Sequence, residues 1–312
     1  MIAILSRLRR PVVIGAMFVA AGIVGSAYEL QGNEKSVYVI LTDAQNKPAP
    51  PGAPAQAFKI REDNIDRDVV RAEQIKEAMA IVLLTDTTSA FVGHERDLRT
   101  SSAAFTKRML ADSPQSSVAL WEFGGADIPV ENFTSDASKL EEATKKLFPK
   151  GTVSDVDLSG SAVIRGQNIV GSNLLEAVAG ASKALAKRPE ARRMIVAFHS
   201  DLSVEMTSLT GEQIQNEVNK ANATLIVISL QAMTSNAKQR DNALDNLCPV
   251  SGGRRITITT VQALAATLEN VADVIASQYV VTYSRPSGSA KVVQVGIQAN
   301  GIKASTARWA PK

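Results

Sequence analysis

Residues Met79–Ala90 read MAIVLLTDTTSA, which is six consecutive apolar residues followed by a polar corner. A run of this kind, ended by polar residues, is typical of a strand buried on both faces of a parallel sheet. Asp86 and several hydroxyl side chains follow the strand at its carboxyl end, where open α/β sheets form their ligand crevices. We therefore expect this strand to be central and its corner to be the candidate site.

Strand and helix patterns alternate after this stretch. Apolar strand patterns recur at Val118–Phe123, Met194–Phe198, Thr224–Ile228 and Arg255–Ile258, and helix patterns at Leu98–Met109, Ser172–Leu185, Leu209–Asn219, Asn236–Leu247 and Val261–Ile275. Alternation at this spacing predicts an α/β fold, a mostly parallel sheet with helices on both faces. We expect this α/β unit to span residues 76–285, with a long polar connection at Lys150–Val170.

Both ends of the chain carry β patterns instead. Residues 28–75 contain a strand pattern at Val37–Leu41 and a hairpin pattern that turns at Asp63–Asp66. Residues 286–312 contain two further strand patterns with a turn at Asn300-Gly301. Because an isolated hairpin is marginal in water, we expect this C-terminal hairpin to form a small β sheet with the N-terminal segment.

The first 27 residues resemble an export signal. Three arginines at positions 7, 9 and 10 precede the apolar stretch Pro11–Gly25, and Gly25-Ser26-Ala27 is a small-residue cleavage site. The alternative is an uncleaved anchor, for which the apolar stretch is short. Either interpretation places the rest of the protein outside the cytoplasm, in a secreted, periplasmic or cell-envelope location.

Composition and charge argue against several function classes. Removing the three N-terminal arginines lowers the 34 basic residues to 31, equal to the 31 acidic residues, so no basic footprint for nucleic acid remains. Contact with a membrane is expected only through an uncleaved N-terminal segment. Cys248 is the only cysteine, which excludes an intramolecular disulfide, and we expect its thiol to be buried and inert.

The chain resembles the von Willebrand factor type A domain family, and within it the bacterial exported proteins with a VWFA-related domain. Val82–Ser89 is similar to the family's first strand and corner. Matching stretches follow in the family's order and cover most of the chain after residue 27: Val39–Pro48, Phe58–Asn64, Phe133–Asp136, Ser251–Arg254 and Ser277–Tyr283. The resemblance implies a von Willebrand factor A-like, Rossmann-like fold.

The resemblance also implies a metal-ion-dependent adhesion site, in which oxygen ligands hold a divalent cation such as Mg²⁺. The family's ligands would fall here on Asp86, Thr88, Ala90, Ser172 and the position of Ser200. Ala90 has no ligand atom, and the acid expected at Ser200 stands one residue later, at Asp201. The candidate metal residues are thus Asp86, Thr88, Ser172 and Asp201, and the set is degenerate. The alternative is that Asp86 and Ser172 cap helix N-termini.

Three functions are compatible with this sequence. The first is an exported, non-enzymatic module that binds a protein partner at the degenerate site without a cofactor. The second is an adhesion module that depends on Mg²⁺ or another divalent cation. The third is a hydrolase built on Ser200, His199 and Asp201; adjacent residues at a strand end diverge, so we do not expect a catalytic triad there or any enzymatic activity. His94, the other histidine, is expected at the surface near a helix start.

Overall fold

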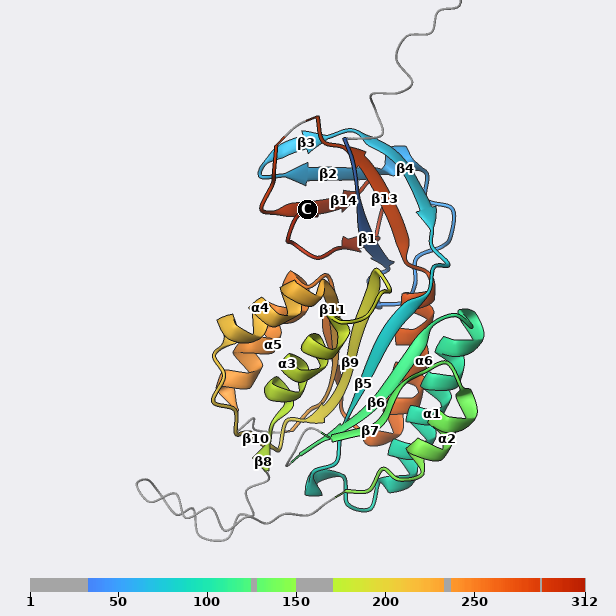
Figure 1. Ribbon diagram of the computed structural model, residues 1–312, viewed down its shortest axis with the longest axis vertical. Coiled ribbons are helices and arrows are strands. Elements are labelled where there is room, and N and C mark those ends of the chain that lie inside the picture. Colours follow the sequence, from blue (N-terminus) through green and yellow to red (C-terminus); the bar gives the residue numbers. More distant parts are fainter. Residues whose placement is uncertain (1–32, 125–127, 150–170, 233–236, 287, 312) are drawn as a thin grey trace, which may run out of the picture.

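The computed structural model describes residues 33–124, 128–149, 171–232, 237–286 and 288–311. An α/β unit lies below a smaller all-β unit in Figure 1. The expected export segment, residues 1–27, and the whole connection 150–170 fall outside the described residues. Within the described part of the chain, no helix has the length and apolar character needed to cross a membrane.

A six-stranded sheet forms the centre of the α/β unit. Its order is β12 (Arg254–Ile258), β11 (Ala223–Leu230), β9 (Arg192–Ser200), β5 (Met79–Asp86), β6 (Ser117–Phe123) and β7 (Ile128–Thr134). All neighbours pair in parallel except β7, which is antiparallel to β6. Strand β5 is central, and all of its residues are buried, as its apolar sequence predicts.

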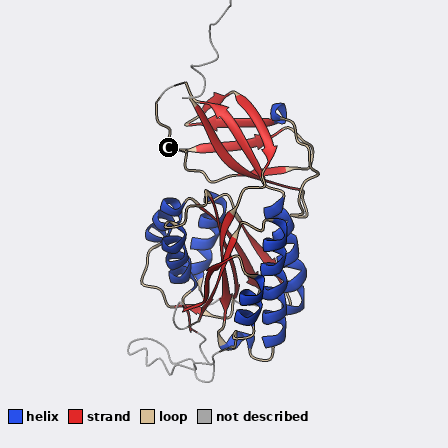
Figure 2. Ribbon diagram, turned by 45° about the vertical axis from the view of Figure 1, so that its right-hand side comes forward, coloured by secondary structure: helices blue, strands red, loops and turns tan. Residues whose placement is uncertain are grey.

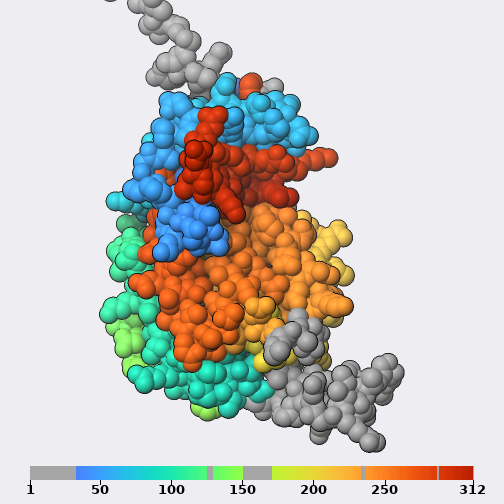
Figure 3. Space-filling model, turned by 180° about the vertical axis from the view of Figure 1, so that it is seen from behind, coloured from blue at the N-terminus to red at the C-terminus, as the bar shows by residue number. Residues whose placement is uncertain are grey.

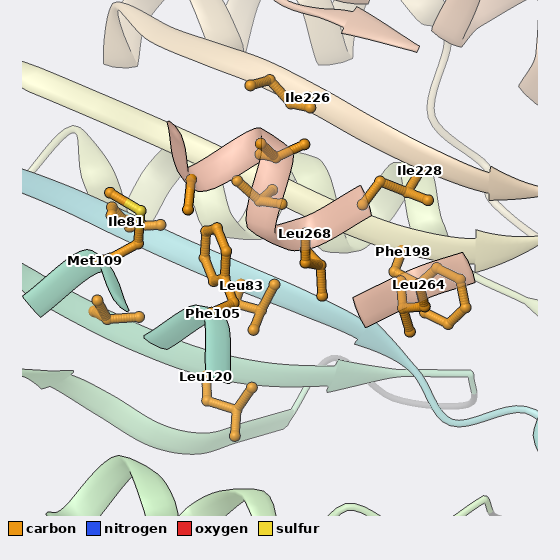
Figure 4. Packing of buried hydrophobic residues seen from close by; sticks show 14 of the residues in the cluster. Ile81, Leu83, Phe105, Met109, Leu120, Phe198, Ile226, Ile228, Leu264 and Leu268 are labelled. Carbon is orange, nitrogen blue, oxygen red and sulfur yellow. The ribbon is translucent and has the colours of Figure 1, made fainter. Parts of the chain in front are cut away.

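Helices cover both faces of this sheet (Figures 1 and 2). One layer contains α1 (Glu95–Asp112), α2 (Ala137–Thr144) and α6 (Leu264–Ala276), and the other contains α3 (Leu174–Leu185), α4 (Gly211–Ala221) and α5 (Lys238–Val250). Because side chains alternate along a strand, β5 contributes to both cores. Ile81 and Leu83 pack with Phe105 of α1 and Leu268 of α6 (Figure 4), while Val82 joins the opposite core.

The all-β unit combines strands from both ends of the chain. Its four-stranded sheet has the order β15 (Lys303–Ser305), β1 (Glu34–Thr42), β13 (Tyr279–Ser284) and β4 (Val69–Gln74). Its three-stranded sheet has the order β14 (Val293–Ile297), β2 (Phe58–Glu62) and β3 (Ile65–Arg67). The N-terminal and C-terminal segments lie side by side in Figure 3, in blue and red. The predicted fold class is therefore confirmed, with two small antiparallel sheets where one was expected.

Strand pairing in the all-β unit differs from the prediction in two ways. The C-terminal strands pair mainly with N-terminal strands, β14 with β2 and β15 with β1, and the two C-terminal segments meet each other at an isolated antiparallel bridge between Val292 and Trp309. Strand β13 lies between β1 and β4, although the predicted domain boundary at residue 285 assigned this strand to the α/β unit. Both differences have one physical reason: the N-terminal strands offer long-range ladder partners that no local pattern reveals.

Two local features also differ from the sequence expectation. Strand β7 was not predicted; it contains Pro129, which a strand accepts at the edge of a sheet because its missing N–H is not needed there. The predicted turn at Asp63–Asp66 is tighter than expected. Asp63 and Asn64 have φ of 45° and 68° and form a two-residue turn, so β3 begins at Ile65.

Cys248 is expected to resist thiol reagents until the protein unfolds. The side chain is fully buried in α5, as the sequence predicts, and burial raises the pKa of its thiol to about 12. The reactive thiolate is therefore scarce in the folded protein. Labelling with a chromogenic disulfide reagent at neutral pH should be slow in buffer and complete in urea. Rapid labelling of the folded chain would contradict this.

Candidate functional site

The candidate site lies where the chain changes direction within the central sheet. From β5 the chain passes to β6 on one side, and it later returns to β9 on the other side of β5. Such a switch point opens a crevice at the carboxyl ends of the two strands. Asp86 is the last residue of β5 and Ser200 the last residue of β9.

Asp86 is completely buried at this edge of the sheet. Its Oδ1 accepts a hydrogen bond from the backbone N–H of Thr88 at 2.8 Å, and its Oδ2 accepts one from the backbone N–H of Ser200 at 3.1 Å. Burial raises the pKa of Asp86 to about 6, and the two backbone hydrogen bonds together with the nearby hydroxyl of Thr88 offset part of the rise. Each carboxylate oxygen keeps a lone pair for a further ligand.

Two buried hydroxyls at this edge have no partner in hydrogen-bond geometry among the described residues, Oγ1 of Thr88 and Oγ of Ser172, although the Thr88 hydroxyl lies close enough to Asp86 to lower the pKa of that carboxyl. Thr88 packs against Gly124, whose φ is +126° and where an added Cβ would lie 2.8 Å from Cγ2 of Thr88. The backbone N–H of Gly124 donates to Oδ1 of Asn173 at 2.9 Å, which joins this contact to the start of α3. Buried hydroxyls usually find a partner, so two unpartnered ones at one edge point to a ligand.

Neither Asp86 nor Ser172 caps a helix. His94 is the N-cap residue of α1 and Asn173 that of α3. Ser172 instead lies in β8 (Gly171–Ser172), a short strand drawn beside the carboxyl ends of the central strands in Figure 1. The capping alternative is therefore wrong for both residues.

Asp201 lies in an ion-pair cluster of its own. Its Oδ1 is 3.0 Å from Nη2 of Arg255 and 3.6 Å from Nη2 of Arg240. Arg240 is completely buried and also donates to the carbonyl oxygen of Ser203 at 2.7 Å. Burial raises the pKa of Asp201, and the two arginines oppose that rise. Asp201 thus neutralises buried Arg240 and partly exposed Arg255, so its carboxylate is already paired.

Glu205 belongs to this edge, although the sequence did not indicate it. It lies in β10 (Val204–Glu205), which pairs in parallel with β8 so that Glu205 stands opposite Ser172. Its Oε1 accepts from the backbone N–H of Leu175 at 3.2 Å, and its Oε2 is buried without a described partner. Burial raises the pKa of Glu205 to about 8. A two-residue strand has no periodicity, so no sequence signal could have identified it.

The histidines do not complete a catalytic relay. Nε2 of His199 lies 2.7 Å from Oγ of Ser229, while Oγ of Ser200 accepts from the backbone N–H of Leu202 at 3.2 Å. Burial and the charges of two arginines lower the pKa of His199 to about 3, so the ring is neutral near pH 7. Nδ1 of His94 lies 3.6 Å from Oδ2 of Asp97, and both side chains are partly exposed.

Exposed apolar side chains occur on the segments that leave this edge. Val92 follows the 3₁₀ turn after β5, Leu202 follows β9, and Met206 follows β10. Their exposed fractions are 60%, 52% and 51%, which places them among the few large apolar residues exposed in the described chain. All three lie on segments that leave one edge of the sheet, the edge that holds Asp86.

A cation could be held here only by a mixed set of oxygens. The described residues contain no cluster of three or more His, Cys, Asp or Glu side chains suited to a metal. Asp86, Thr88, Ser172 and Glu205 nevertheless offer two carboxylates and two hydroxyls, which is the oxygen chemistry that Mg²⁺ and Ca²⁺ prefer. The unpartnered oxygens of Thr88, Ser172 and Glu205 fit this use.

A cavity of about 480 Å³ lies away from this edge, against the all-β unit. Its lining includes Tyr38, Asn222 and Trp309. The indole N–H of Trp309 donates to Oδ1 of Asn222 at 2.7 Å. None of the buried unpartnered oxygens described above lines this cavity, so we place the candidate site at the carboxyl edge of the sheet.

No protein-family model and no curated protein sequence matches the chain. Solved structures are similar in fold at low identity. Proximal thread matrix protein 1 from the mussel byssus, with a zinc-occupied MIDAS motif, has a TM-score of 0.50 and 12% identity over 69% of this chain. The match covers 50% of the mussel protein, so this chain spans about half of it.

Two further structures are similar. The von Willebrand factor type A protein from Catenulispora acidiphila has a TM-score of 0.48 and 10% identity, and the match covers 89% of this chain and 74% of that one. The VWA domain of SpRpn10 has a TM-score of 0.45 and 14% identity over 61% of this chain and 95% of that one. Identities this low concern the fold alone. With its strand order and two helical layers, the chain has a von Willebrand factor A-like fold to which an all-β unit is joined.

Proposed function

We propose that this chain is an exported, non-enzymatic interaction module that binds a protein partner at the carboxyl edge of its central sheet. One observation carries the proposal: exposed Val92, Leu202 and Met206 lie on the segments that leave the edge where two buried hydroxyls are unpartnered. Apolar anchors beside a polar centre are the usual composition of a protein-binding surface. The sequence resemblance to exported VWFA-related proteins supports the same role and the export.

The adhesion site is degenerate in this proposal. Ala90 has no ligand atom, and Asp201 is held by Arg255 at 3.0 Å. Of the five ligand positions that the family resemblance assigns, one therefore has no ligand atom, and the acid of another is occupied by an ion pair. The unpartnered hydroxyls of Thr88 and Ser172 favour the second candidate, an adhesion module that depends on a divalent cation.

A hydrolase is the weakest candidate. A serine nucleophile needs a base within hydrogen-bond reach. The ring of His199 is directed to Ser229 at 2.7 Å, and the Oγ of Ser200 accepts from a backbone N–H instead. An esterase and peptidase screen of the purified protein is expected to show no turnover.

The double change Leu202→Asp and Met206→Asp is expected to reduce partner capture at least about tenfold, because buried apolar anchors contribute more than 1 kcal/mol each to binding. The measurement is cross-linking of the full chain in its native envelope, followed by quantitative mass spectrometry. The matched control is Val70→Asp in β4, since Val70 is 50% exposed but lies in the all-β unit. Equal capture by the double variant and wild type would contradict the proposed surface, and a cytoplasmic location would contradict export.

A further inference from the structure

We propose that the open edge of strand β1, where it borders the cavity between the two units, binds an extended, uncharged peptide segment of a protein partner by strand addition. In this mode of binding, the peptide continues a sheet through backbone hydrogen bonds, and its alternate side chains enter pockets. The site goes beyond the proposed function, because it is separate from the edge of the central sheet that holds Asp86.

Strand β1 has ladder partners of unequal length on its two sides. Antiparallel β13 pairs with Glu34–Val39, whereas β15, on the other side, pairs only with Ile40–Thr42. After β15 the chain leaves β1, and Ala307 forms a bridge with Ser251 at the end of α5 instead. On that side, the first half of β1 therefore has no ladder partner among the described residues.

The backbone of Ser36 is directed to this open side. Ser36 and Thr282 of β13 are register partners whose hydroxyl oxygens lie 3.0 Å apart. Close side chains are typical of the antiparallel pairs whose backbone groups point away from each other. Tyr38, two residues later, agrees with this direction, because its carbonyl oxygen accepts a hydrogen bond at 2.7 Å from the hydroxyl of Thr306, which directly follows β15. The N–H and C=O of Ser36 are therefore free to pair with an added strand.

The open edge borders a cavity of suitable size. Ser36, Val37 and Tyr38 of β1 line the cavity, together with residues of α4, of β11 and of the C-terminal segment. Helix α4 lies at the end of the α/β unit that faces the all-β unit (Figure 1). The volume of about 480 Å³ is within the range of roughly 300–1,000 Å³ found for ligand pockets. An added strand would therefore have room for its side chains on the face toward α4.

The lining favours an uncharged occupant with an apolar side chain. Lys220 is the only charged residue among the described residues that line the cavity, and its Nζ is already paired with Oε1 of Glu217 at 2.7 Å. The indole N–H of Trp309 is bound to Oδ1 of Asn222 at 2.7 Å, so the ring itself is left for apolar contact. Aromatic rings of this kind are frequent anchors in protein interfaces.

The first test is hydrogen exchange of the full chain at residue resolution. In the free protein, the amide of Ser36 should exchange faster than that of Val37, because only the amide of Val37 faces β13. The probe peptide is obtained by selecting a phage-displayed library of random heptapeptides on the immobilised chain and synthesising the most enriched sequence. Addition of this peptide should slow the exchange of Ser36 and leave that of Val37 unchanged.

The second test is the affinity of the same peptide for Ser36→Pro. Proline removes the N–H that faces the cavity but none that pairs with β13, so the edge of the sheet should accept it. Binding should weaken at least about fivefold, which corresponds to one net hydrogen bond. The matched control is Ser36→Ala, which keeps the N–H and should bind like the wild type, and urea unfolding verifies that both variants fold.

Four results would overturn the proposal: equal exchange of Ser36 and Val37 in the free chain, no enrichment of any peptide, equal peptide affinity of folded Ser36→Pro and wild type, or a dimer in sedimentation that Ser36→Pro dissociates. The last result would show that a second copy of the chain occupies the edge. Leu202→Asp/Met206→Asp should bind the peptide like the wild type, so this site and the proposed partner surface can fail separately.

Discussion

Glu62→Gln is expected to lower the free energy of unfolding by about 3–5 kcal/mol, because it leaves a buried arginine without its counter-charge. Glu62 is completely buried at the end of β2. Its Oε2 accepts from Nε of Arg285 at 2.9 Å and from Nε of Arg67 at 3.1 Å, and its Oε1 accepts from the hydroxyl of Tyr283. Tyr283 lies in β13 of the four-stranded sheet, and Arg285 directly follows that strand. The carboxylate of Glu62 therefore joins the two sheets of the all-β unit.

The loss of stability caused by Glu62→Gln should become smaller as the pH falls. Burial alone would raise the pKa of Glu62, but hydrogen bonds from Arg285 and Tyr283 and the charge of Arg67 outweigh it and hold the pKa below the ordinary value of 4.5. A lowered folded-state pKa stabilises the protein above the unfolded-state pKa, and this contribution disappears as the pH falls through the folded-state pKa. The stability difference between wild type and Glu62→Gln should therefore shrink below pH 4.5.

Urea unfolding at neutral pH and at a series of acidic pH values measures both effects. The matched control is Asp66→Asn in the neighbouring strand β3, whose exposed carboxylate is paired with exposed Arg61 at 2.8 Å. Solvent screens that pair, so the control should behave like the wild type. A Glu62→Gln protein as stable as the control at neutral pH would show that the buried carboxylate does not hold the sheets together.

Gly253→Ala is expected to destabilise the protein by about 3 kcal/mol or more, at the upper end of the cost of overpacking. A Cβ at this position would lie 1.9 Å from the carbonyl oxygen and 2.6 Å from the carbonyl carbon of Leu225. Both atoms belong to the backbone of β11, which cannot rotate away. The loop between α5 and β12 would have to separate from the central sheet.

The neighbouring residue joins the two units at the same place. Gly252 has a φ of +80°, and an added Cβ would lie 2.4 Å from the backbone nitrogen of Ala307. The backbone N–H of Arg308 donates to the carbonyl oxygen of Val250 at 2.8 Å, which holds the C-terminal segment against the end of α5. Displacement of this loop by Gly253→Ala should therefore also loosen the attachment of the all-β unit.

The matched control for Gly253→Ala is Gly211→Ala at the start of α4. An added Cβ there meets nothing within 4 Å. Alanine favours helix and restricts the unfolded chain, so this variant should be neutral or slightly more stable, by up to about 1 kcal/mol. Unfolding by urea, followed by circular dichroism, compares the variants. If Gly253→Ala and Gly211→Ala unfold at the same urea concentration, the close contact with Leu225 is not a constraint.

Part of the candidate site could be predicted from the sequence. Asp86 and Thr88 stand at the carboxyl end of a clear buried-strand pattern, and Ser172 precedes a clear helix pattern. Because the strands are parallel, these three residues are predicted to lie at the same edge of the sheet. The sequence also predicts that Asp201 lies at this edge, but it does not reveal which groups its carboxylate binds. Whether that carboxylate faces the crevice or Arg240 and Arg255 depends on side chains that are 39 and 54 residues away in the chain.

The sequence by itself determined the α/β class, the central place of β5 and the burial of Cys248, because hydrophobic periodicity and an uninterrupted apolar run are local properties of the chain. Only the tertiary structure decided which strands pair across the two chain ends and where Glu205 lies. Backbone ladders such as those of β14 with β2 and of β8 with β10 form between any extended segments that packing brings together, so no residue type encodes them. The corner at Asp86 therefore keeps its place as the candidate site, while the position of Glu205 opposite Ser172 is a property of the fold.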